Sequence, residues 1–400
     1  MILMARCSKR ESLKAVWKVS KMTSLENLWW NCCLLSFITW LSACQNGDKN
    51  YYTQNTGYTL DTIHINPKKR ILDVSGYMNV SSLDDHGTSF FLYNRHDHSI
   101  DEINLDRKEF IKNYPLDAEG PNGVGESIFG LQFLEDSLLF LKSVPFSSVI
   151  DRNGHMVQKI NWLTVKDSNG VQLEIPPPRM EVVVKTKDWL VMGTNLDFWK
   201  KTAFLGVFSV QDNRVKNIDI DPELSFPNYF LNVDNNFRDP WVFLHSDNNY
   251  IYVSHEYSNE IILLDPEGKI VKVVHYEPAL TPSKADLPQI LTGTREQIRD
   301  EEQNLLGQIR FEAPVWDNAK KRYYRLSAKR MFKDGSESDI NSQLSETRVF
   351  LSVFDAEFNL VNEMEIEELY DEHFKYFAKD GKLWVCQNFS DELGFLVFDF

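Results

Sequence analysis

Five arginines lie between or beside predicted β-strands of a chain that is acidic as a whole. They are Arg95, Arg179, Arg238, Arg310 and Arg330. A guanidinium group presents a planar fork of N–H donors that suits carboxylates, phosphates and sugar hydroxyls. The arginines therefore favour a site for an anionic or carbohydrate ligand. The alternative is that they pair with acidic residues of neighbouring repeats, since exposed arginines are common on protein surfaces.

Three histidines and one glutamate form a second candidate for chemistry. His96 and His98 stand two residues apart in one predicted loop, and His255 and Glu256 are adjacent in another. Two histidines at this spacing can chelate a metal, but a site needs further ligands, and His255 is the one evident candidate. We therefore predict no metal and no cofactor. An acid–base or metal site built from these four residues is the alternative.

Other catalytic signatures are incomplete. Gly120, Gly123 and Gly125 could bind a phosphate through their amides, but no Lys-Ser/Thr pair follows them. Glu126 has no second carboxylate fixed nearby in the sequence, so a glycosidase pair cannot be argued. The sequence contains no Gly-x-Ser-x-Gly and no His-Glu-x-x-His motif. These observations favour a protein that binds over one that catalyses.

The elements that must position these residues recur along the chain. The stretch Asn248–Tyr276 predicts three strands, with turn chemistry at Asp265–Gly268. The same unit occurs six times, and its third strand aligns as Ile100–Asp106, Ser147–Gly154, Leu205–Asn213, Ile261–Gly268, Val349–Phe358 and Phe395–Asp399. Six repeats of this kind predict an all-β fold, a six-bladed β-propeller with four-stranded blades.

The two ends of the chain predict a closed ring. The sixth copy stops at Phe400, where its fourth strand should begin, and the unassigned strand Thr59–Ile65 precedes the first copy. We expect this strand to be the outer strand of the last blade, which leaves no open edge. The propeller then spans residues 59–400. Within it, residues 281–308 predict a helical insertion that either covers the mouth or is a surface decoration.

This fold would bring the candidate residues to one face. The connections between propeller blades share a face with the loops between second and third strands, and binding residues usually lie in such loops. We assign Arg179, Arg238 and Arg310 to the first set and Arg95, His255 and their neighbours to the second. One mouth of the propeller is therefore the predicted site.

Charge excludes one class of partner. The net charge is −15, and because residues 1–43 contribute +4, the remainder carries −19. Such a surface repels nucleic acids and anionic membranes. We expect a monomer that binds no nucleic acid.

The N-terminal segment is typical of an exported protein. A basic region leads into the short apolar run Leu28–Trp40, which ends at Leu41-Ser42-Ala43-Cys44. A spanning helix needs about 20 apolar residues, so residues 1–43 predict a signal peptide. The alternatives are a short membrane helix or a misread upstream region, with translation beginning at Met1 or at Met22.

The cleavage motif resembles the lipobox of bacterial lipoproteins, whose cysteine is acylated. The resemblance implies a lipid on Cys44 as the only membrane anchor, a tether over residues 44–58, and a place in the cell envelope, on the periplasmic or surface side of the outer membrane. The other cysteine after cleavage, Cys386, lies in a strand pattern. We therefore expect a buried thiol and no disulfide.

Three further stretches support a family resemblance: Glu119–Gly125, Pro314–Asp317 and Tyr323–Arg325. With the six repeats and the lipobox, they resemble the six-bladed propeller lipoproteins of Bacteroidota, and in particular the family catalogued as domain of unknown function 4221. The resemblance covers about residues 58–400. It implies the propeller fold, and it implies no reaction, ligand or catalytic residue.

These observations predict a lipid-anchored envelope protein whose propeller is a non-catalytic binding or interaction module. Its partner would be a small anionic or carbohydrate ligand or another envelope protein. The predicted ligand-binding residues are Arg95, His96, His98, Arg179, Arg238, His255, Glu256, Arg310 and Arg330. The alternatives are a hydrolase or lyase of the same fold and a structural subunit of an envelope complex.

Overall fold

The computed structural model describes residues 57–75, 78–135, 138–172, 178–185, 189–197, 202–220, 226–234, 236–238, 240–247, 250–333, 344–371 and 375–400. All of them belong to one compact unit, Gly57–Phe400. The predicted signal peptide, Cys44 and most of the predicted tether lie outside the described residues. None of the helices in the described part of the chain has the length and apolar character that crossing a bilayer requires.

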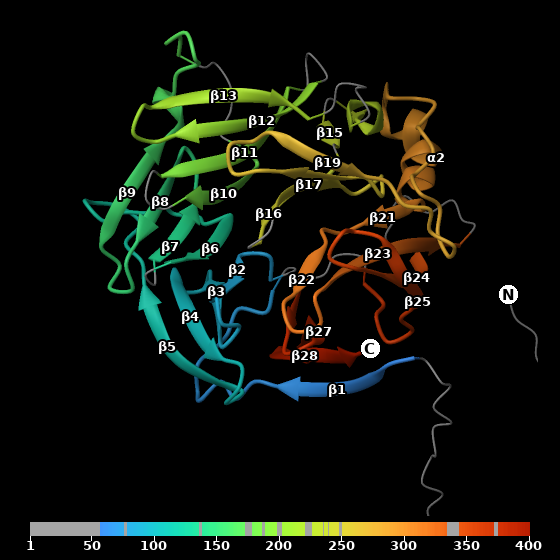
Figure 1. Ribbon diagram of the computed structural model, residues 1–400, viewed down its shortest axis with the longest axis horizontal. Coiled ribbons are helices and arrows are strands. Elements are labelled where there is room, and N and C mark those ends of the chain that lie inside the picture. The colour runs from blue at the N-terminus through green and yellow to red at the C-terminus, as the bar shows by residue number, and fades with distance from the viewer. Residues whose placement is uncertain are drawn as a thin grey trace, which may run out of the picture. The chain divides into compact units, whose positions relative to one another are not determined.

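Six antiparallel β-sheets are arranged in a ring, which confirms the predicted six-bladed β-propeller (Figure 1). The strands of the first three blades are β2 (Ser81–Leu83), β3 (Ser89–Asn94), β4 (Ser99–Asn104) and β5 (Glu109–Pro115); β6 (Gly130–Leu134), β7 (Leu138–Lys142), β8 (Phe146–Ile150) and β9 (Met156–Asn161); and β10 (Met180–Lys185), β11 (Leu190–Asp197), β12 (Thr202–Ser209) and β13 (Arg214–Asp219).

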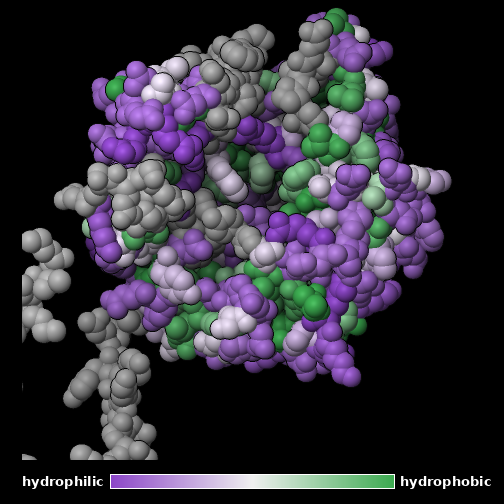
Figure 2. All heavy atoms as spheres, turned by 180° about the vertical axis from the view of Figure 1, so that it is seen from behind, coloured by the Kyte–Doolittle hydropathy of each residue, from purple (hydrophilic) through white to green (hydrophobic). Residues whose placement is uncertain are grey.

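The strands of the last three blades are β16 (Val242–Ser246), β17 (Ile251–His255), β18 (Ile261–Leu264) and β19 (Ile270–Val274); β21 (Ile309–Phe311), β23 (Arg322–Phe332), β24 (Leu344–Phe354) and β25 (Leu360–Glu365), with β22 (Val315–Asp317) also on β23; and β26 (Tyr376–Lys379), β27 (Lys382–Phe389), β28 (Glu392–Asp399) and β1 (Thr59–His64). One face of the ring is hollowed towards its centre, and hydrophilic side chains surround most of the rim (Figure 2).

The ring is closed by the N-terminal strand, as the sequence predicts. β1 pairs antiparallel with β28, with Thr59 opposite Asp399. Buried apolar residues of the first and last blades also pack against each other and help to close the ring. The centroid of the Phe90 ring lies 5.8 Å from that of Phe377 and 5.7 Å from that of Phe395. Clusters of the same kind lie between the other neighbouring blades. Hydrophobic burial between sheets therefore holds the blades together.

The predicted insertion contains one α-helix, α2 (Arg295–Leu306). Gln297 Oε1 accepts a hydrogen bond from the Thr294 backbone N at 2.8 Å, which stabilises the start of the helix. Its buried side chains Ile298 and Leu305 belong to the same cluster as Leu231 of β14. The short strands beside the helix are β14 (Leu231–Val233), β15 (Asn236–Arg238) and β20 (Thr292–Gly293).

Two connections between blades thus combine into one small body, which we call the insertion lobe. It consists of β14 and β15, which precede β16, and of β20 and α2, which follow β19. Two 3₁₀ helices complete the described elements: η2 (Trp162–Thr164) and η3 (Phe226–Tyr229).

Candidate functional site

A cleft of about 450 Å³ lies where the connection from β1 to β2 meets the end of β3 and the connection from β5 to β6. We call it the blade-1 cleft. Its polar lining residues are Asp73, Ser75, Asn79, Arg95, Glu126 and Ser127, and its apolar and aromatic ones are Met78, Val80, Leu92, Tyr93, Ile128 and Phe129. Apolar walls with a few convergent polar groups are typical of ligand sites.

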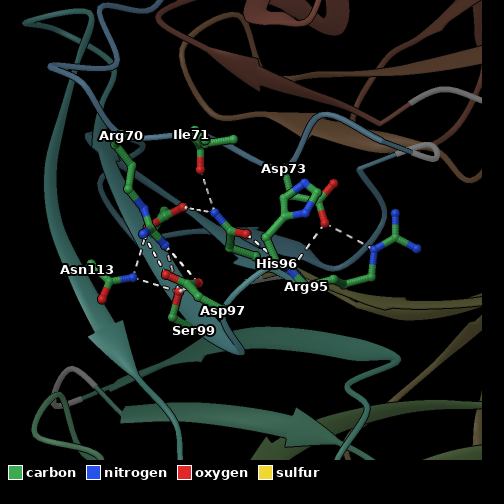
Figure 3. Close-up of polar contacts among 10 residues, drawn as sticks. Arg70, Ile71, Asp73, Arg95, His96, Asp97, Ser99 and Asn113 are labelled. Atoms are coloured by element: carbon green, nitrogen blue, oxygen red, sulfur yellow. Dashed lines mark hydrogen bonds and ion pairs between the residues drawn. The ribbon is translucent and has the colours of Figure 1, made fainter.

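Asp73 and Arg95 form an ion pair in this cleft (Figure 3). The Arg95 Nε and backbone N donate to Asp73 Oδ2 at 3.0 and 3.1 Å, and Arg95 Nη2 donates to Ser75 Oγ. Burial alone would raise the pKa of Asp73, but the hydrogen bonds from Ser75 and Arg95 outweigh it and lower the pKa to about 2. The Asp73 side chain is 3% exposed and that of Arg95 59% exposed. A buried, ionised carboxylate therefore holds a guanidinium group that reaches solvent.

A second network links the two segments that carry Asp73 and Arg95. Asn94 Nδ2 donates to the Ile71 carbonyl at 2.7 Å and to Asp101 Oδ2 at 2.8 Å. Arg70 donates to Asp101 from Nε at 2.8 Å and to Asp97 from both Nη atoms at 2.6 and 2.9 Å (Figure 3). The hydrogen bond from Arg70 lowers the pKa of Asp97. These contacts tie the connection before β2, which carries Asp73, to the loop after β3, which carries Arg95.

The floor and the rim of the cleft differ in exposure. Met78, Leu92 and Ile128 are buried, and they provide an apolar floor. Phe129 is 59% exposed at the rim. Glu126 is also exposed, and no hydrogen-bond or ion-pair partner is found for it among the described residues. The cleft therefore presents a free carboxylate and an aromatic ring to an incoming ligand.

Two of the other predicted arginines have structural partners. Arg310 donates to Glu256 Oε2 from Nε at 3.1 Å and from Nη2 at 2.5 Å, and both side chains are buried. Because Glu256 follows β17 and Arg310 lies in β21, this pair joins adjacent blades. Arg238 Nε lies 2.6 Å from Glu302 Oε1 and joins β15 to α2. The Arg310 pair matches the predicted alternative in which arginines bridge adjacent blades, whereas the Arg238 pair lies within the insertion lobe.

The last two arginines also lie outside the cleft. Arg179 is exposed just before β10, and its carbonyl accepts a hydrogen bond from Lys142 Nζ. Arg330 is half-buried in β23, opposite Thr347. Arg238, Arg310 and Arg330 thus belong to strands, where the sequence predicted loops, so that part of the prediction is wrong. Of the nine predicted ligand-binding residues, Arg95 alone lines the blade-1 cleft.

His255 is a core residue. It is 2% exposed, its ring centroid lies 4.2 Å from that of Phe226, and its Nδ1 accepts a hydrogen bond from the Tyr257 backbone N at 3.3 Å. Burial, together with the charge of Arg325, lowers the pKa of His255 to about 3. The ring is therefore neutral at physiological pH and is enclosed by aromatic side chains.

The histidines do not assemble a metal or acid–base site. His96 is exposed, and His98 Nδ1 shares a hydrogen bond with Tyr93 Oη at 2.8 Å. Across the described ranges, no three His, Cys, Asp or Glu side chains lie close enough together to hold a metal ion. Glu256 is engaged by Arg310. The alternative built on His96, His98, His255 and Glu256 thus has no geometric support.

Sequence reasoning missed the connection that carries Asp73 and Ser75. Once Thr59–Ile65 is placed in the last blade, the residues between it and β2 must form the sixth connection between blades, on the same face as the other five. The candidate loops did not include this connection. The signal was therefore present in the predicted topology, although nothing in the residue types around Asp73 marks it.

Comparison with known families agrees with this fold. The chain matches the family described as Domain of unknown function (DUF4221) over residues 54–365. It belongs to this family. A solved member of DUF4221 from Bacteroides vulgatus has a TM-score of 0.60 and 14% sequence identity to this chain, and the match covers 86% of this chain and 98% of that one. At this identity the likeness shows the fold alone.

Two other solved structures are more distant. A Bacteroides fragilis protein that carries the name exported protein has a TM-score of 0.48 at 6% identity, over 85% of this chain and 94% of that one. The β-propeller domain of Swd1 from Myceliophteria thermophila has a TM-score of 0.41 at 8% identity, over 84% of this chain and 99% of that one. A search of curated proteins gives no match to the DUF4221 chain.

Proposed function

We propose that this DUF4221 protein is a lipid-anchored protein of the bacterial cell envelope, whose propeller binds a carbohydrate in the blade-1 cleft without catalysing a reaction. The observation that carries the proposal is the Asp73–Arg95 pair, which lines a cleft of about 450 Å³ and leaves the guanidinium group open to solvent. This pair offers hydrogen-bond donors and acceptors at fixed positions, as sugar hydroxyls require. The apolar lining offers a surface for the less polar face of a sugar ring.

The balance of charge favours a sugar over a simple anion. The charge of Arg95 is already matched by Asp73 at 3.0 Å, and Glu126 adds another carboxylate to the same lining. An anion entering this cleft would meet no surplus of positive charge. A ligand rich in hydroxyl groups can use both the guanidinium and the carboxylates.

The same residues favour binding over hydrolysis. Glycosidases use two carboxyl groups that flank the scissile bond, and one of them must donate a proton. The hydrogen bonds of Asp73 hold its pKa at about 2, so it stays ionised at neutral pH and cannot act as that acid. Glu126 is the only other carboxylate of the described cleft lining. Both oxygens of Asp73 already accept hydrogen bonds, from Ser75 and from Arg95, so Asp73 is not free to act as the nucleophile or base beside Glu126.

The anchor part of the proposal is supported by the N-terminal pattern and by the placement of the other cysteine. Cys44 ends the lipobox-like motif, and Cys386 is buried, with a pKa that burial raises to about 12. Metabolic labelling with an alkyne analogue of palmitate tests this part. The label should be lost in Cys44→Ala and kept in Cys386→Ala. A label that persists in Cys44→Ala would exclude the proposed anchor.

The binding part can be tested by titration calorimetry of the purified chain against a panel of oligosaccharides. Arg95→Ala should weaken binding by about ten-fold or more, since hydrogen bonds to charged groups are worth about 1.5–3 kcal/mol. Arg348→Ala is the matched control, because Arg348 is a half-exposed arginine paired with Glu365 at 2.5 Å in the fifth blade. If no oligosaccharide binds, or if Arg95→Ala binds as tightly as the control, the proposal fails.

A further inference from the structure

The lining of the blade-1 cleft carries two carboxylates, Asp73 and Glu126, and one guanidinium group, Arg95. Arg95 is paired with Asp73. Glu126 lines the cleft as well, and it is exposed, with no partner among the described residues. The carboxylate without a counter-charge therefore lies at the rim, where a ligand would enter.

An exposed aromatic ring stands in the same segment as this carboxylate. Phe129 lies three residues after Glu126, lines the same cleft and is 59% exposed. Its backbone N donates to the Lys142 carbonyl at 2.8 Å, so the segment is anchored to β7 just before β6 begins. A free carboxylate beside an aromatic face suits a ligand that has both an apolar face and a positive charge.

We infer that the blade-1 cleft selects glycans that carry a free, protonated amine, over neutral and acidic sugars. This inference rests on the proposed carbohydrate-binding function and names its ligand class. The ammonium group would donate hydrogen bonds to Glu126, while sugar hydroxyls bind Arg95 and Asp73. The less polar face of the sugar ring would lie on Phe129. An acidic sugar would place a like charge beside two carboxylates.

The test compares oligosaccharides of equal length whose sugars bear free amines, N-acetyl groups or carboxylates. Titration calorimetry with the purified full chain should show that the amine form binds about five-fold more tightly than the N-acetyl form, as an exposed ion pair allows, and that the acidic form binds most weakly. The preference for the amine form should shrink as the salt concentration rises.

Two glutamate variants test whether Glu126 is the source of the preference for the amine form. Glu126→Gln should weaken binding of the amine form more than binding of the N-acetyl form, so that the advantage of the amine form is lost. Glu357→Gln is the matched control, because Glu357 is an exposed glutamate in the turn between β24 and β25. The control should keep the full preference.

The outcomes separate this inference from the function on which it rests. If the N-acetyl form binds and the amine form binds no more tightly, or if the acidic form binds most tightly, the inference is wrong and carbohydrate binding stands. If Glu126→Gln keeps the amine preference, Glu126 is not its source and the inference is also wrong. If none of the three forms binds, the proposed function and the inference both fail.

Discussion

Two arginine–carboxylate pairs of this propeller have the same chemistry and opposite surroundings. Arg310 and Glu256 are 9% and 4% exposed and join two blades, whereas Arg95 is 59% exposed and lines a cleft. A buried pair that loses one partner leaves a charge that water cannot reach, while an exposed guanidinium group can exchange partners with a ligand. The comparison teaches that the surroundings of an arginine, and not its residue type, separate the buried Arg310, which joins two blades, from the candidate binding residue Arg95.

The largest effect is expected at the buried pair. Arg310→Ala should lower the free energy of unfolding by about 3–5 kcal/mol, because it leaves the Glu256 carboxylate buried without its ion-pair partner. Urea unfolding measures this loss. The double variant Arg310→Met/Glu256→Gln should recover part of it, since no uncompensated charge is then buried. A loss below about 1 kcal/mol in Arg310→Ala would show that the burial of the pair has no energetic weight.

An intermediate effect is expected at the insertion lobe. Arg238 is 57% exposed, but its partner Glu302 is 4% exposed on α2. Arg238→Ala should destabilise the protein by about 1–2 kcal/mol, because the buried carboxylate loses its counter-charge. Hydrogen exchange should show the loss in the amides of α2 and β14. Uniformly faster exchange over all blades would contradict a local role.

A smaller effect, dependent on pH, is expected at the cleft. The stability that Asp73 contributes is present above its ordinary pKa of 3.8 and is lost as the pH falls towards about 2. Arg95→Ala removes hydrogen bonds that favour the carboxylate, so the folded-state pKa of Asp73 should rise towards its ordinary value and less stability should be lost on acidification. Between pH 7 and pH 3 the free energy of unfolding should therefore fall less in the variant than in the wild type, by about 1 kcal/mol. If the free energies of unfolding of the wild type and the variant changed with pH in parallel, Arg95 would not be what lowers the pKa of Asp73.

The smallest effect is expected at the exposed pair in the fifth blade. Arg348 and Glu365 are 44% and 33% exposed and lie 2.5 Å apart. Arg348→Ala should change the free energy of unfolding by less than about 1 kcal/mol, since water solvates either partner alone. Urea unfolding at low and high salt provides the measurement. A loss as large as that of Arg310→Ala would show that exposure does not determine how much an ion pair contributes to the free energy of unfolding.

The repeats were predictable because they depend on local patterns. Apolar runs such as the buried β18 mark middle strands, and turns such as Asp265–Gly268 separate them. The truncated sixth copy predicted that Thr59–Ile65 closes the ring, and β1 does so. The candidate site was predicted in part: Arg95 was named, and Asp73 was missed because its connection was not counted among those between blades.

The number of blades and the closure of the ring could be predicted from the sequence alone. The periodicity of apolar residues, the turns and the incomplete last repeat were sufficient for that prediction. The role of each arginine was decided by the tertiary structure. Arg310 and Arg95 are identical as residues, but Arg310 is buried against Glu256 of the neighbouring blade, while the end of β3 opens into a cleft. The free energy of a charged side chain depends on the water and the partner groups around it. Folding brings those partner groups from segments that are distant in the sequence.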